Sequence, residues 1–362
     1  MGIMSTHLKK VALEGCNGNW AQRRYLPLLT QKAGENELKL LAIDVVPEPG
    51  DFAAELWHAV KDQNRVCYLN KSRYSEEYQR LTDVDYVFIV APDQFHCQIA
   101  EFWLPRLTPT GNIFIEKPLD ASVQSALSLK EKIGKDKVIY AFDHYLARAE
   151  PFLRDKTRYL ARIGSIKRVE FHILEPFSIT PNRVKALDKG MIFDLFSHIL
   201  ALVAGVTNSS TTAFFQRIKL EEVKAAKYVN CSISGESFAW IEFSIDDVPI
   251  TAAVGKCVAA SEDKLMALYG TTGKIELDFI KDRFFITDSQ GTQQGRLNPN
   301  HVESFLEFIL HNRMPLLSVP GVLNFDTALE ILRILEESKK RICKMHLYHC
   351  KTSLEDILRS LG

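Results

Sequence analysis

Two side chains able to take up or release a proton stand close together in an apolar stretch. Asp194 and His198 are four residues apart, so on a helix they lie one turn apart on the same face. Burying a carboxylate or an imidazole without a partner costs free energy, so each needs one. Either the two side chains satisfy each other, or they hold a polyhydroxy ligand whose hydroxyl proton the imidazole can accept.

A lysine able to assist such chemistry lies in the tripeptide Glu116-Lys117-Pro118. The proline keeps Lys117 extended, directly after a β-rich apolar run. Ligands of doubly wound folds bind at the carboxyl ends of the strands, where an ammonium group can hydrogen-bond a substrate hydroxyl and help remove its proton. The alternative interpretation of this tripeptide is an ordinary surface turn.

A glycine-rich turn provides a candidate cofactor site. The segment Gly15-Cys16-Asn17-Gly18-Asn19-Trp20-Ala21 follows an apolar run and opens a helix-like segment. Glycines in this context let the backbone approach a pyrophosphate at a helix N-terminus. The alternative is that the small residues only allow close packing.

Asp44 ends the next apolar run and favours one form of the cofactor. A carboxylate there accepts hydrogen bonds from both ribose hydroxyls and repels a 2′-phosphate, so we expect NAD, with NADP possible. Alternatively, Asp44 only caps a turn.

The first part of the chain alternates strand-like and helix-like segments, which predicts βαβ units and a parallel sheet. We therefore expect a dinucleotide-binding Rossmann domain over residues 1–140. The segments are strands at 11–14, 38–43, 86–91, 112–116 and 138–142, and helices at 20–32, 51–62 and 122–133.

After residue 160, short strands follow one another without intervening helices, and helical stripes begin after residue 300. This pattern predicts an α+β domain over residues 141–362 with a large, open, mainly antiparallel sheet. Its expected roles are substrate binding and oligomerisation. The run 238–245 is apolar on both sides, and only the helices after Asn300 remain to cover one face, so we predict a homodimer or homotetramer packed sheet to sheet.

Composition excludes several classes of protein. Forty-five basic and 45 acidic residues give zero formal net charge, unlike a nucleic-acid-binding surface. The most lipid-like stretch, 195–206, is interrupted by His198 and is too short to span a membrane. Seven cysteines without a secretory leader indicate reduced thiols and a cytoplasmic protein.

The C-terminal region contains a possible metal-ligand cluster. On a helix, Cys343, His346 and Cys350 would share one face, and such ligands suit zinc. The interpretation we favour is a helix end with half-buried thiols, so we expect no metal.

The order G-x-x-G-x-x-A, then A-P-D-Q-F-H (Ala91 to His96), then E-K-P, then D-x-x-x-H resembles the Gfo/Idh/MocA family of sugar and cyclitol dehydrogenases. The turn Ile163-Gly164-Ser165-Ile166 also resembles that family. The resemblance implies Lys117 and His198 at the reacting hydroxyl, with Asp194 orienting it. The cofactor-binding residues that it implies are Gly15, Asn17, Gly18, Asn19, Trp20, Asp44, Ala91, Pro92, His96 and Glu116.

Two segments, Gly15 to Leu29 and Phe142 to Arg148, are similar instead to glucose-6-phosphate dehydrogenase. That resemblance implies that His144 contacts a sugar phosphate and Arg148 the substrate. Alternatively, this segment is a solvated helix start with Asp143 as its cap. The chain departs from both families. Its turn lacks the G-x-G-x-x-G spacing, Ala201 replaces an acidic residue, and Arg148 replaces a lysine.

Together these features predict an NAD(P)-dependent dehydrogenase or ketoreductase that acts on a secondary hydroxyl of a sugar, sugar phosphate or cyclitol. One alternative is a non-catalytic regulator on the same fold that senses a nucleotide and a sugar. Another is a zinc dehydrogenase that uses the Cys343 cluster.

Overall fold

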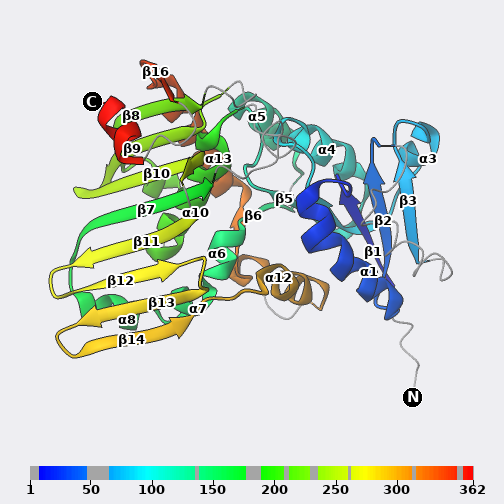
Figure 1. Ribbon diagram of the computed structural model, residues 1–362. Coiled ribbons are helices and arrows are strands. Elements are labelled where there is room, and N and C mark those ends of the chain that lie inside the picture. The colour runs from blue at the N-terminus through cyan, green and yellow to red at the C-terminus, as the bar shows by residue number, and fades with distance from the viewer. Residues whose placement is uncertain are drawn as a thin grey trace. The chain divides into compact units, whose positions relative to one another are not determined.

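The computed structural model describes residues 8–46, 65–134, 138–176, 189–207, 212–228, 235–259, 262–311, 315–348 and 354–361. The helix predicted over 51–62 lies outside these residues. The chain divides into two compact units (Figure 1). The first comprises Met1–Phe142 and Val302–Phe325, and the second comprises Asp143–His301 and Asp326–Gly362.

The first unit is built on a seven-stranded sheet of order β15-β6-β5-β4-β1-β2-β3. All neighbours pair in parallel except β15, which is antiparallel to β6. The strands are β1 Lys9–Glu14, β2 Leu38–Asp44, β3 Val66–Asn70, β4 Val84–Ile89, β5 Leu107–Glu116, β6 Val138–Phe142 and β15 Val322–Asn324. The predicted parallel Rossmann sheet is confirmed.

Helices flank this sheet and complete its core. They are η1 Ala21–Tyr25, α1 Leu26–Gly34, α3 Ser75–Gln79, η3 Asp93–Phe95, α4 His96–Trp103, η4 Leu104–Arg106, α5 Val123–Lys132, α12 His301–Leu310 and η6 Leu316–Ser318. The stripe predicted on α12 is buried, and the Phe305 ring lies 4.0 Å from that of Phe142 and 5.4 Å from that of Phe114. A segment far along the sequence therefore packs on the Rossmann sheet.

The second unit is built on a nine-stranded sheet of order β14-β13-β12-β11-β7-β10-β9-β8-β16. Most pairs are antiparallel, but β10 is parallel to β7 and β16 is parallel to β8. The strands are β7 Ile166–Pro176, β8 Ile218–Tyr228, β9 Phe238–Ile245, β10 Val248–Ala259, β11 Asp263–Gly270, β12 Gly273–Asp278, β13 Arg283–Asp288, β14 Gly291–Arg296 and β16 Met345–Tyr348. The predicted large, mainly antiparallel sheet is confirmed.

One face of this sheet is apolar and lies under helices. The helices of the unit are α6 His144–Arg148, α7 Glu150–Arg154, α8 Lys156–Ile163, η5 Ile192–Phe196, α10 Ser197–Thr207, α11 Thr212–Phe215, α13 Phe325–Lys340 and α14 Leu354–Leu361. Helix η5 packs on β10, and α10 is apolar and buried almost all round. The expectation that only helices after Asn300 cover the sheet is therefore wrong.

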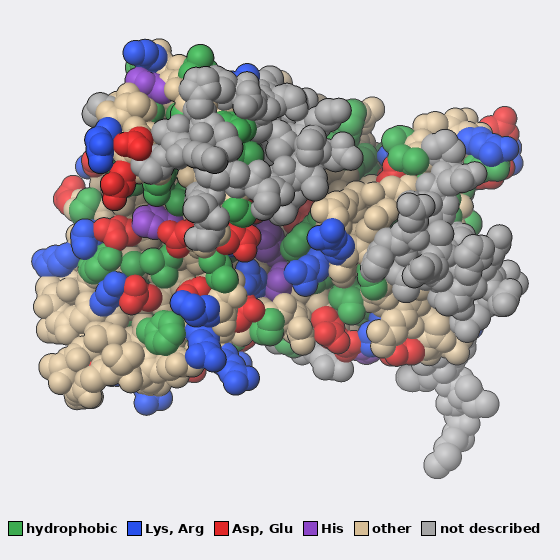
Figure 2. All heavy atoms as spheres, in the orientation of Figure 1, with side chains coloured by type: hydrophobic (Ala, Val, Ile, Leu, Met, Phe, Trp, Pro, Cys, Tyr) green, Lys and Arg blue, Asp and Glu red, His purple; other side chains and the backbone are tan. Residues whose placement is uncertain are grey.

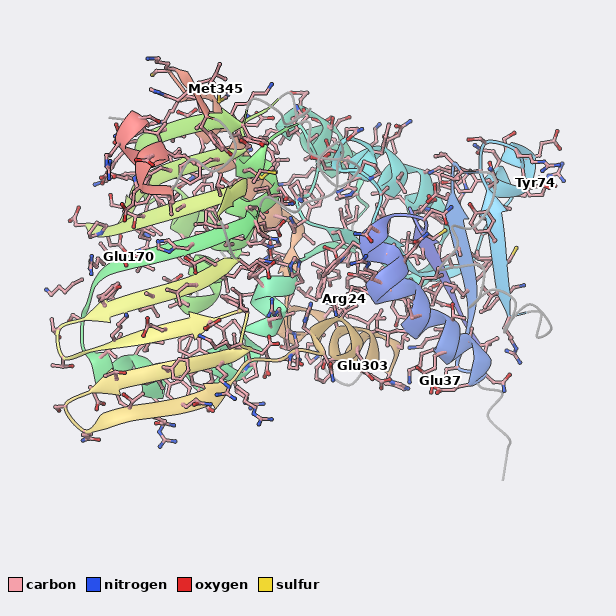
Figure 3. The ribbon with its side chains drawn as sticks, in the orientation of Figure 1. Arg24, Glu37, Tyr74, Glu170, Glu303 and Met345 are labelled. Atoms are coloured by element: carbon pink, nitrogen blue, oxygen red, sulfur yellow. The ribbon has the colours of Figure 1, made fainter. Side chains whose placement is uncertain are left out.

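The opposite face carries paired charges rather than an open apolar surface. Arg168 lies 2.6 Å from Glu170, and Lys274 lies 2.7 Å from Glu276. Figure 2 shows acidic and basic side chains interspersed over the strands, and Figure 3 labels Glu170 on β7. Alternation along β7 thus places charged residues on this face and Val169, Phe171 and Ile173 in the core.

The C-terminal residues complete one end of the sheet. Met345, labelled in Figure 3, begins edge strand β16, and α14 packs Ile357 and Leu361 against Phe238 on the charged face. The shared helix face that a zinc site would need is not formed, because residues 345–348 pair with β8 as a strand. Cys343 follows the end of α13, as the favoured interpretation has it, but its thiol is exposed rather than half-buried. Cys350 lies outside the described residues, which contain no group of three or more potential metal ligands.

No helix in the described ranges is both long and apolar enough to cross a membrane.

Candidate functional site

The glycine turn of the first unit leaves no room for a side chain at Gly15 and little at Gly18. Gly15 has a φ of +78°, and a Cβ there would lie 2.6 Å from the Cα of Ala91. A Cβ on Gly18 would lie 3.2 Å from the Gly15 carbonyl oxygen. The turn follows β1 and is tied to β2 by the Gly15 N–H, which donates to the Ile43 carbonyl at 2.9 Å. This bare backbone, followed by η1, fits the pyrophosphate of a dinucleotide.

Asp44 stands at the carboxyl end of β2 and organises the same turn. Its carboxylate accepts hydrogen bonds from the backbone N–H groups of Asn17 at 2.9 Å and Val45 at 2.7 Å. The side-chain amide of Asn17 in turn donates from Nδ2 to the Tyr68 hydroxyl at 2.8 Å, a contact that the sequence did not indicate. Asp44 is therefore a turn cap in this structure, and its hydrogen bonding to a cofactor ribose stays a prediction.

Glu116 connects the lysine-bearing loop to the start of the first helix. Its carboxylate accepts hydrogen bonds from Trp20 Nε1 at 3.0 Å and from the Tyr25 hydroxyl at 2.6 Å. Burial and the Glu116 charge raise the pKa of Tyr25 well above its usual value. Within this unit, the predicted cofactor residues Trp20 and Glu116 hold each other in place.

His96 bridges the two loops that follow β4 and β5. The side chain is 2% exposed, with Nδ1 2.9 Å from the Pro118 carbonyl oxygen and Nε2 2.7 Å from that of Ala91. Both ring nitrogens face backbone carbonyls, so His96 positions Ala91, Pro92 and the Lys117 loop. The Lys117–Pro118 peptide bond is cis.

In the second unit, His198 is paired with a carboxylate that the sequence suggested only as a helix cap. Asp143 Oδ2 lies 2.7 Å from His198 Nδ1, and both side chains are 1% exposed. The other oxygen, Oδ1, accepts the Leu146 N–H at 2.9 Å and caps α6. A proton on Nδ1 leaves the imidazole lone pair on Nε2, the arrangement of a general base.

Aromatic rings surround this pair. The ring centroid of His144 lies 4.4 Å from that of His198, and the ring centroid of Tyr145 lies 4.5 Å from it. His301, which sequence reasoning missed, stacks 5.8 Å from His144. Burial raises the pKa of Tyr145 well above its usual value, so its hydroxyl stays protonated.

Asp194 lies on the π-helical turn η5 and pairs with a lysine from the sheet. Lys256 Nζ is 2.5 Å from Asp194 Oδ2 and 3.7 Å from Glu175. The i→i+5 winding of η5 differs from the α-helical turn that the four-residue spacing suggested. Lys256 and Glu175 carried no sequence signal, because their partners are distant in the chain.

Arg148, predicted to bind the substrate, is held within its own unit. Its guanidinium donates to Asp282 at 2.6 Å and to the Phe279 carbonyl, and it lies over the ring of Tyr145. The structure therefore places His144 beside His198 and directs Arg148 to the turn between β12 and β13.

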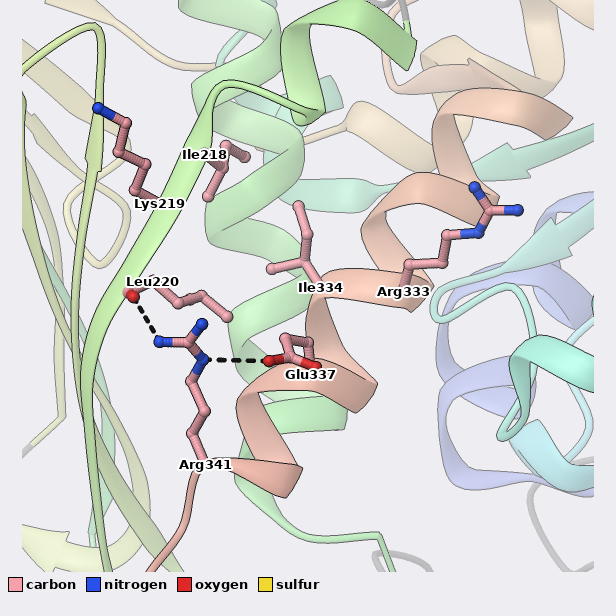
Figure 4. Close-up of a pocket in the computed structure, with 7 residues that line it drawn as sticks. All are labelled: Ile218, Lys219, Leu220, Arg333, Ile334, Glu337 and Arg341. Atoms are coloured by element: carbon pink, nitrogen blue, oxygen red, sulfur yellow. Dashed lines mark hydrogen bonds and ion pairs between the residues drawn. The ribbon is translucent and has the colours of Figure 1, made fainter.

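A separate pocket of about 440 Å³ opens between β8 and α13 (Figure 4). Arg341, which lines it, donates to the Leu220 carbonyl at 2.6 Å and to Glu337 at 3.2 Å. The full lining is Ile218, Lys219, Leu220, Arg333, Ile334, Glu337 and Arg341. It contains none of the predicted site residues.

Residues 9–144 match the model of the Gfo/Idh/MocA oxidoreductase family, which is described as an NAD-binding Rossmann fold. This match confirms the resemblance drawn from the motifs, together with an NAD(P)-binding first unit. No protein of curated function gives a significant match.

Solved structures share the fold over nearly the whole chain. A 3-ketoreductase from Actinomadura kijaniata, in complex with NADP and TDP-benzene, is 14% identical, with 95% of this chain and 99% of that chain covered and a TM-score of 0.69. Glucose-6-phosphate 1-dehydrogenase from Mycobacterium avium is 16% identical, with 95% and 94% covered and a TM-score of 0.70. UDP-N-acetylglucosamine 3-dehydrogenase from Acidithiobacillus ferrooxidans is 17% identical, with 93% and 98% covered and a TM-score of 0.66.

Proposed function

We propose that this chain, whose residues 9–144 belong to the NAD-binding Rossmann domain of the Gfo/Idh/MocA oxidoreductase family, transfers a hydride between NAD(P) and a secondary hydroxyl of a sugar, sugar phosphate or cyclitol. The observation that carries the proposal is the buried Asp143–His198 pair in the second unit. A histidine held in a single tautomer by a carboxylate is suited to proton transfer with a substrate hydroxyl.

In the proposed mechanism, His198 Nε2 takes the hydroxyl proton as the carbon–hydrogen bond breaks. Asp143 stabilises the resulting imidazolium through its 2.7 Å contact with Nδ1. Asp194 holds a substrate hydroxyl as an acceptor. Lys117 is assigned to the reacting oxygen on the strength of the family motif. Bound NAD(P) would supply the hydride-transfer chemistry, and in the ketoreductase direction His198 would return the proton to the carbonyl oxygen.

The cofactor assignment draws on Gly15, Gly18 and Asp44. The bare glycine backbone fits a pyrophosphate, and the Asp44 carboxylate at the end of β2 favours NAD over NADP. The structural neighbours include a UDP-N-acetylglucosamine 3-dehydrogenase and a 3-ketoreductase in complex with TDP-benzene, so we add sugar nucleotides to the candidate substrates.

The test is nicotinamide absorbance at 340 nm, with NAD or NADP and a panel of sugars, cyclitols, sugar phosphates and sugar nucleotides. We expect turnover of at least one compound, and a loss of roughly 10²–10⁴ in kcat for His198→Ala and for Lys117→Ala. His346→Gln, on the edge strand β16, is the matched control. Tight binding of a nucleotide and a sugar without turnover of any compound would instead support the sensing regulator.

We also propose a cytoplasmic homodimer or homotetramer. In the described part of the chain, Cys16, Cys67, Cys97 and Cys343 form no disulfide, which supports a reducing compartment.

A further inference from the structure

Charged side chains of alternating sign lie next to one another on the helix-covered face of the second sheet. Glu175 is the last residue but one of β7, and Lys256 lies at the corresponding position of the parallel strand β10. Asp194 lies above them on η5. Lys256 Nζ is 3.7 Å from Glu175 Oε2 and 2.5 Å from Asp194 Oδ2. The three side chains therefore form a row in which the Lys256 ammonium lies between the carboxylates of Glu175 and Asp194.

The backbone fixes the position of Lys256 in this row of charges. Its N–H donates to the Ser237 carbonyl at 2.8 Å, and the strand register shifts directly after it, where Cys257 has a φ of +62°. Side chains two and four residues earlier, Val254 and Ala252, are buried on the same face. A lysine therefore points from an otherwise apolar row toward η5.

The exposed fraction of each side chain indicates which end of this row of charges a ligand can reach. The side chains of Glu175 and Lys256 are each 6% exposed, whereas that of Asp194 is 18% exposed. Lys264 occupies the other side of Glu175 at 3.5 Å and also pairs with Glu262 at 2.6 Å. Asp194 is thus the accessible end, and Lys256 is the support behind it.

The electrostatic consequence concerns what Asp194 can bind. An ammonium group 2.5 Å away favours the ionised carboxylate, which only accepts hydrogen bonds. With Lys264 and Glu262 included, the five charged side chains of this cluster carry one net negative charge. A neutral hydroxyl can donate to this site, whereas a phosphate or carboxylate would be repelled.

We propose that Lys256 is a positioning residue that fixes Asp194 as an ionised acceptor, and that this subsite takes an uncharged hydroxyl of a carbohydrate. The substrate class is therefore one in which the position bound by Asp194 is a free hydroxyl, with any phosphate or nucleotide attached elsewhere. The inference rests on the proposed function, since it assumes that Asp194 contacts the substrate of His198.

The kinetic test uses Lys256→Met, Lys256→Arg and the control Lys274→Met, whose lysine pairs with Glu276 on the opposite face. The probes are the sugar found active in the panel and its monodeoxy analogues. Lys256→Met should lower kcat/KM of the parent sugar roughly 10–100-fold, the cost of a charge-assisted contact. For one deoxy analogue, Lys256→Met should lower kcat/KM by no more than about threefold, because that analogue lacks the hydroxyl that Asp194 binds.

Lys256→Arg should recover most of the activity, because it restores a cation beside Asp194. Lys274→Met should resemble the wild type. An equal loss of kcat/KM for the parent sugar and every deoxy analogue would overturn the subsite. Better turnover of an analogue with a carboxylate in place of the hydroxyl would do the same.

A second measurement separates this inference from the proposed function, because it needs no substrate. Lys256→Met should lower the melting temperature by about 4 °C by leaving Asp194 and Glu175 without their shared cation. Adding Asp194→Asn should restore part of that loss, because the two side chains act as a unit. Additive losses would overturn the Lys256–Asp194 pairing, whereas absence of turnover with coupled losses would overturn only the proposed function.

Discussion

Asp143 binds two groups at once: Oδ2 lies 2.7 Å from His198 Nδ1, while Oδ1 accepts the Leu146 N–H at 2.9 Å. One carboxylate thus begins helix α6 and sets the tautomer of a histidine on α10. The helix cap fixes the Asp143 rotamer, so the orientation of His198 follows from local backbone structure in a different segment.

We predict that Asp143→Asn lowers kcat/KM by roughly 10²–10⁴-fold with little change in stability. Asparagine still caps a helix, but its amide cannot hold the Nδ1–H tautomer as a carboxylate does. Steady-state kinetics and thermal unfolding measure the two effects. Asp143→Ala is the companion variant and should also lose about 1 kcal/mol of stability with the cap. Normal turnover in Asp143→Asn would return the pair to a structural role.

The strands were predictable from the sequence where apolar runs are continuous or alternate. The runs at 38–43 and 238–245 are strands β2 and β9, because periodicity reports burial directly. The apolar surroundings of Asp194 and His198 also predicted that each side chain needs a partner, and each has one, although not the other. Their partners Lys256 and Asp143 could not be predicted, because ion pairs between distant segments depend on strand register and helix placement.

The C-terminal strand shows the same limitation in another form. Residues 345–348 pair with β8 because the edge of a sheet accepts a further strand, although the spacing of Cys343 and His346 suited a helix. Local pattern was overridden by an available partner.

We predict that the wild type binds NAD more tightly than NADP and that Asp44→Ala narrows the difference. The expected change is about 1.5–3 kcal/mol, the range for a charge-assisted hydrogen bond. Because Asp44 also accepts the Asn17 and Val45 N–H groups, affinity for both cofactors should fall. Fluorescence titration with each cofactor measures this. A tenfold preference of the wild type for NADP would contradict the assignment.

Arg148 tests whether the substrate carries a phosphate near His144. If it binds phosphate, Arg148→Ala should remove about 1.5–3 kcal/mol from the preference for phosphorylated sugars and leave free sugars unaffected. Asp282→Asn is the control, since it disturbs the same contact with Arg148 without removing the cation. If both variants slow phosphorylated and free sugars alike, Arg148 serves only to hold α6 against the turn after β12.

Assembly through the second sheet should depend on polar contacts. Phe238 is fully buried beneath α14 and Tyr348 of the same chain, so it does not need a second copy to cover it. The rest of that face carries pairs such as Arg168–Glu170 and Lys274–Glu276. We expect light scattering to show a dimer or tetramer at low salt and partial dissociation near 1 M salt, where charges are screened within about 3 Å. A monomer at micromolar concentration in low salt would refute the homo-oligomer.

A buried lysine makes the stability of the second unit depend on pH. Lys156 is 7% exposed, its ammonium donates to the Gly205 carbonyl near the end of α10, and burial lowers its pKa to about 8. The unfolded chain keeps the ordinary lysine pKa, about 10.4, so between these two values it binds more protons than the folded chain. The free energy of unfolding should therefore rise with pH from about 8 to 10, by at most about 1.4 kcal/mol per pH unit from this group. Below pH 8 the folded protein carries the full cost of the buried charge.

Thermal unfolding of Lys156→Met across the same pH range should lack this rise in the free energy of unfolding. Lys219→Met, which removes a largely exposed lysine, should retain it. An identical pH slope in the wild type and Lys156→Met would show that Lys156 keeps an ordinary pKa in the folded protein.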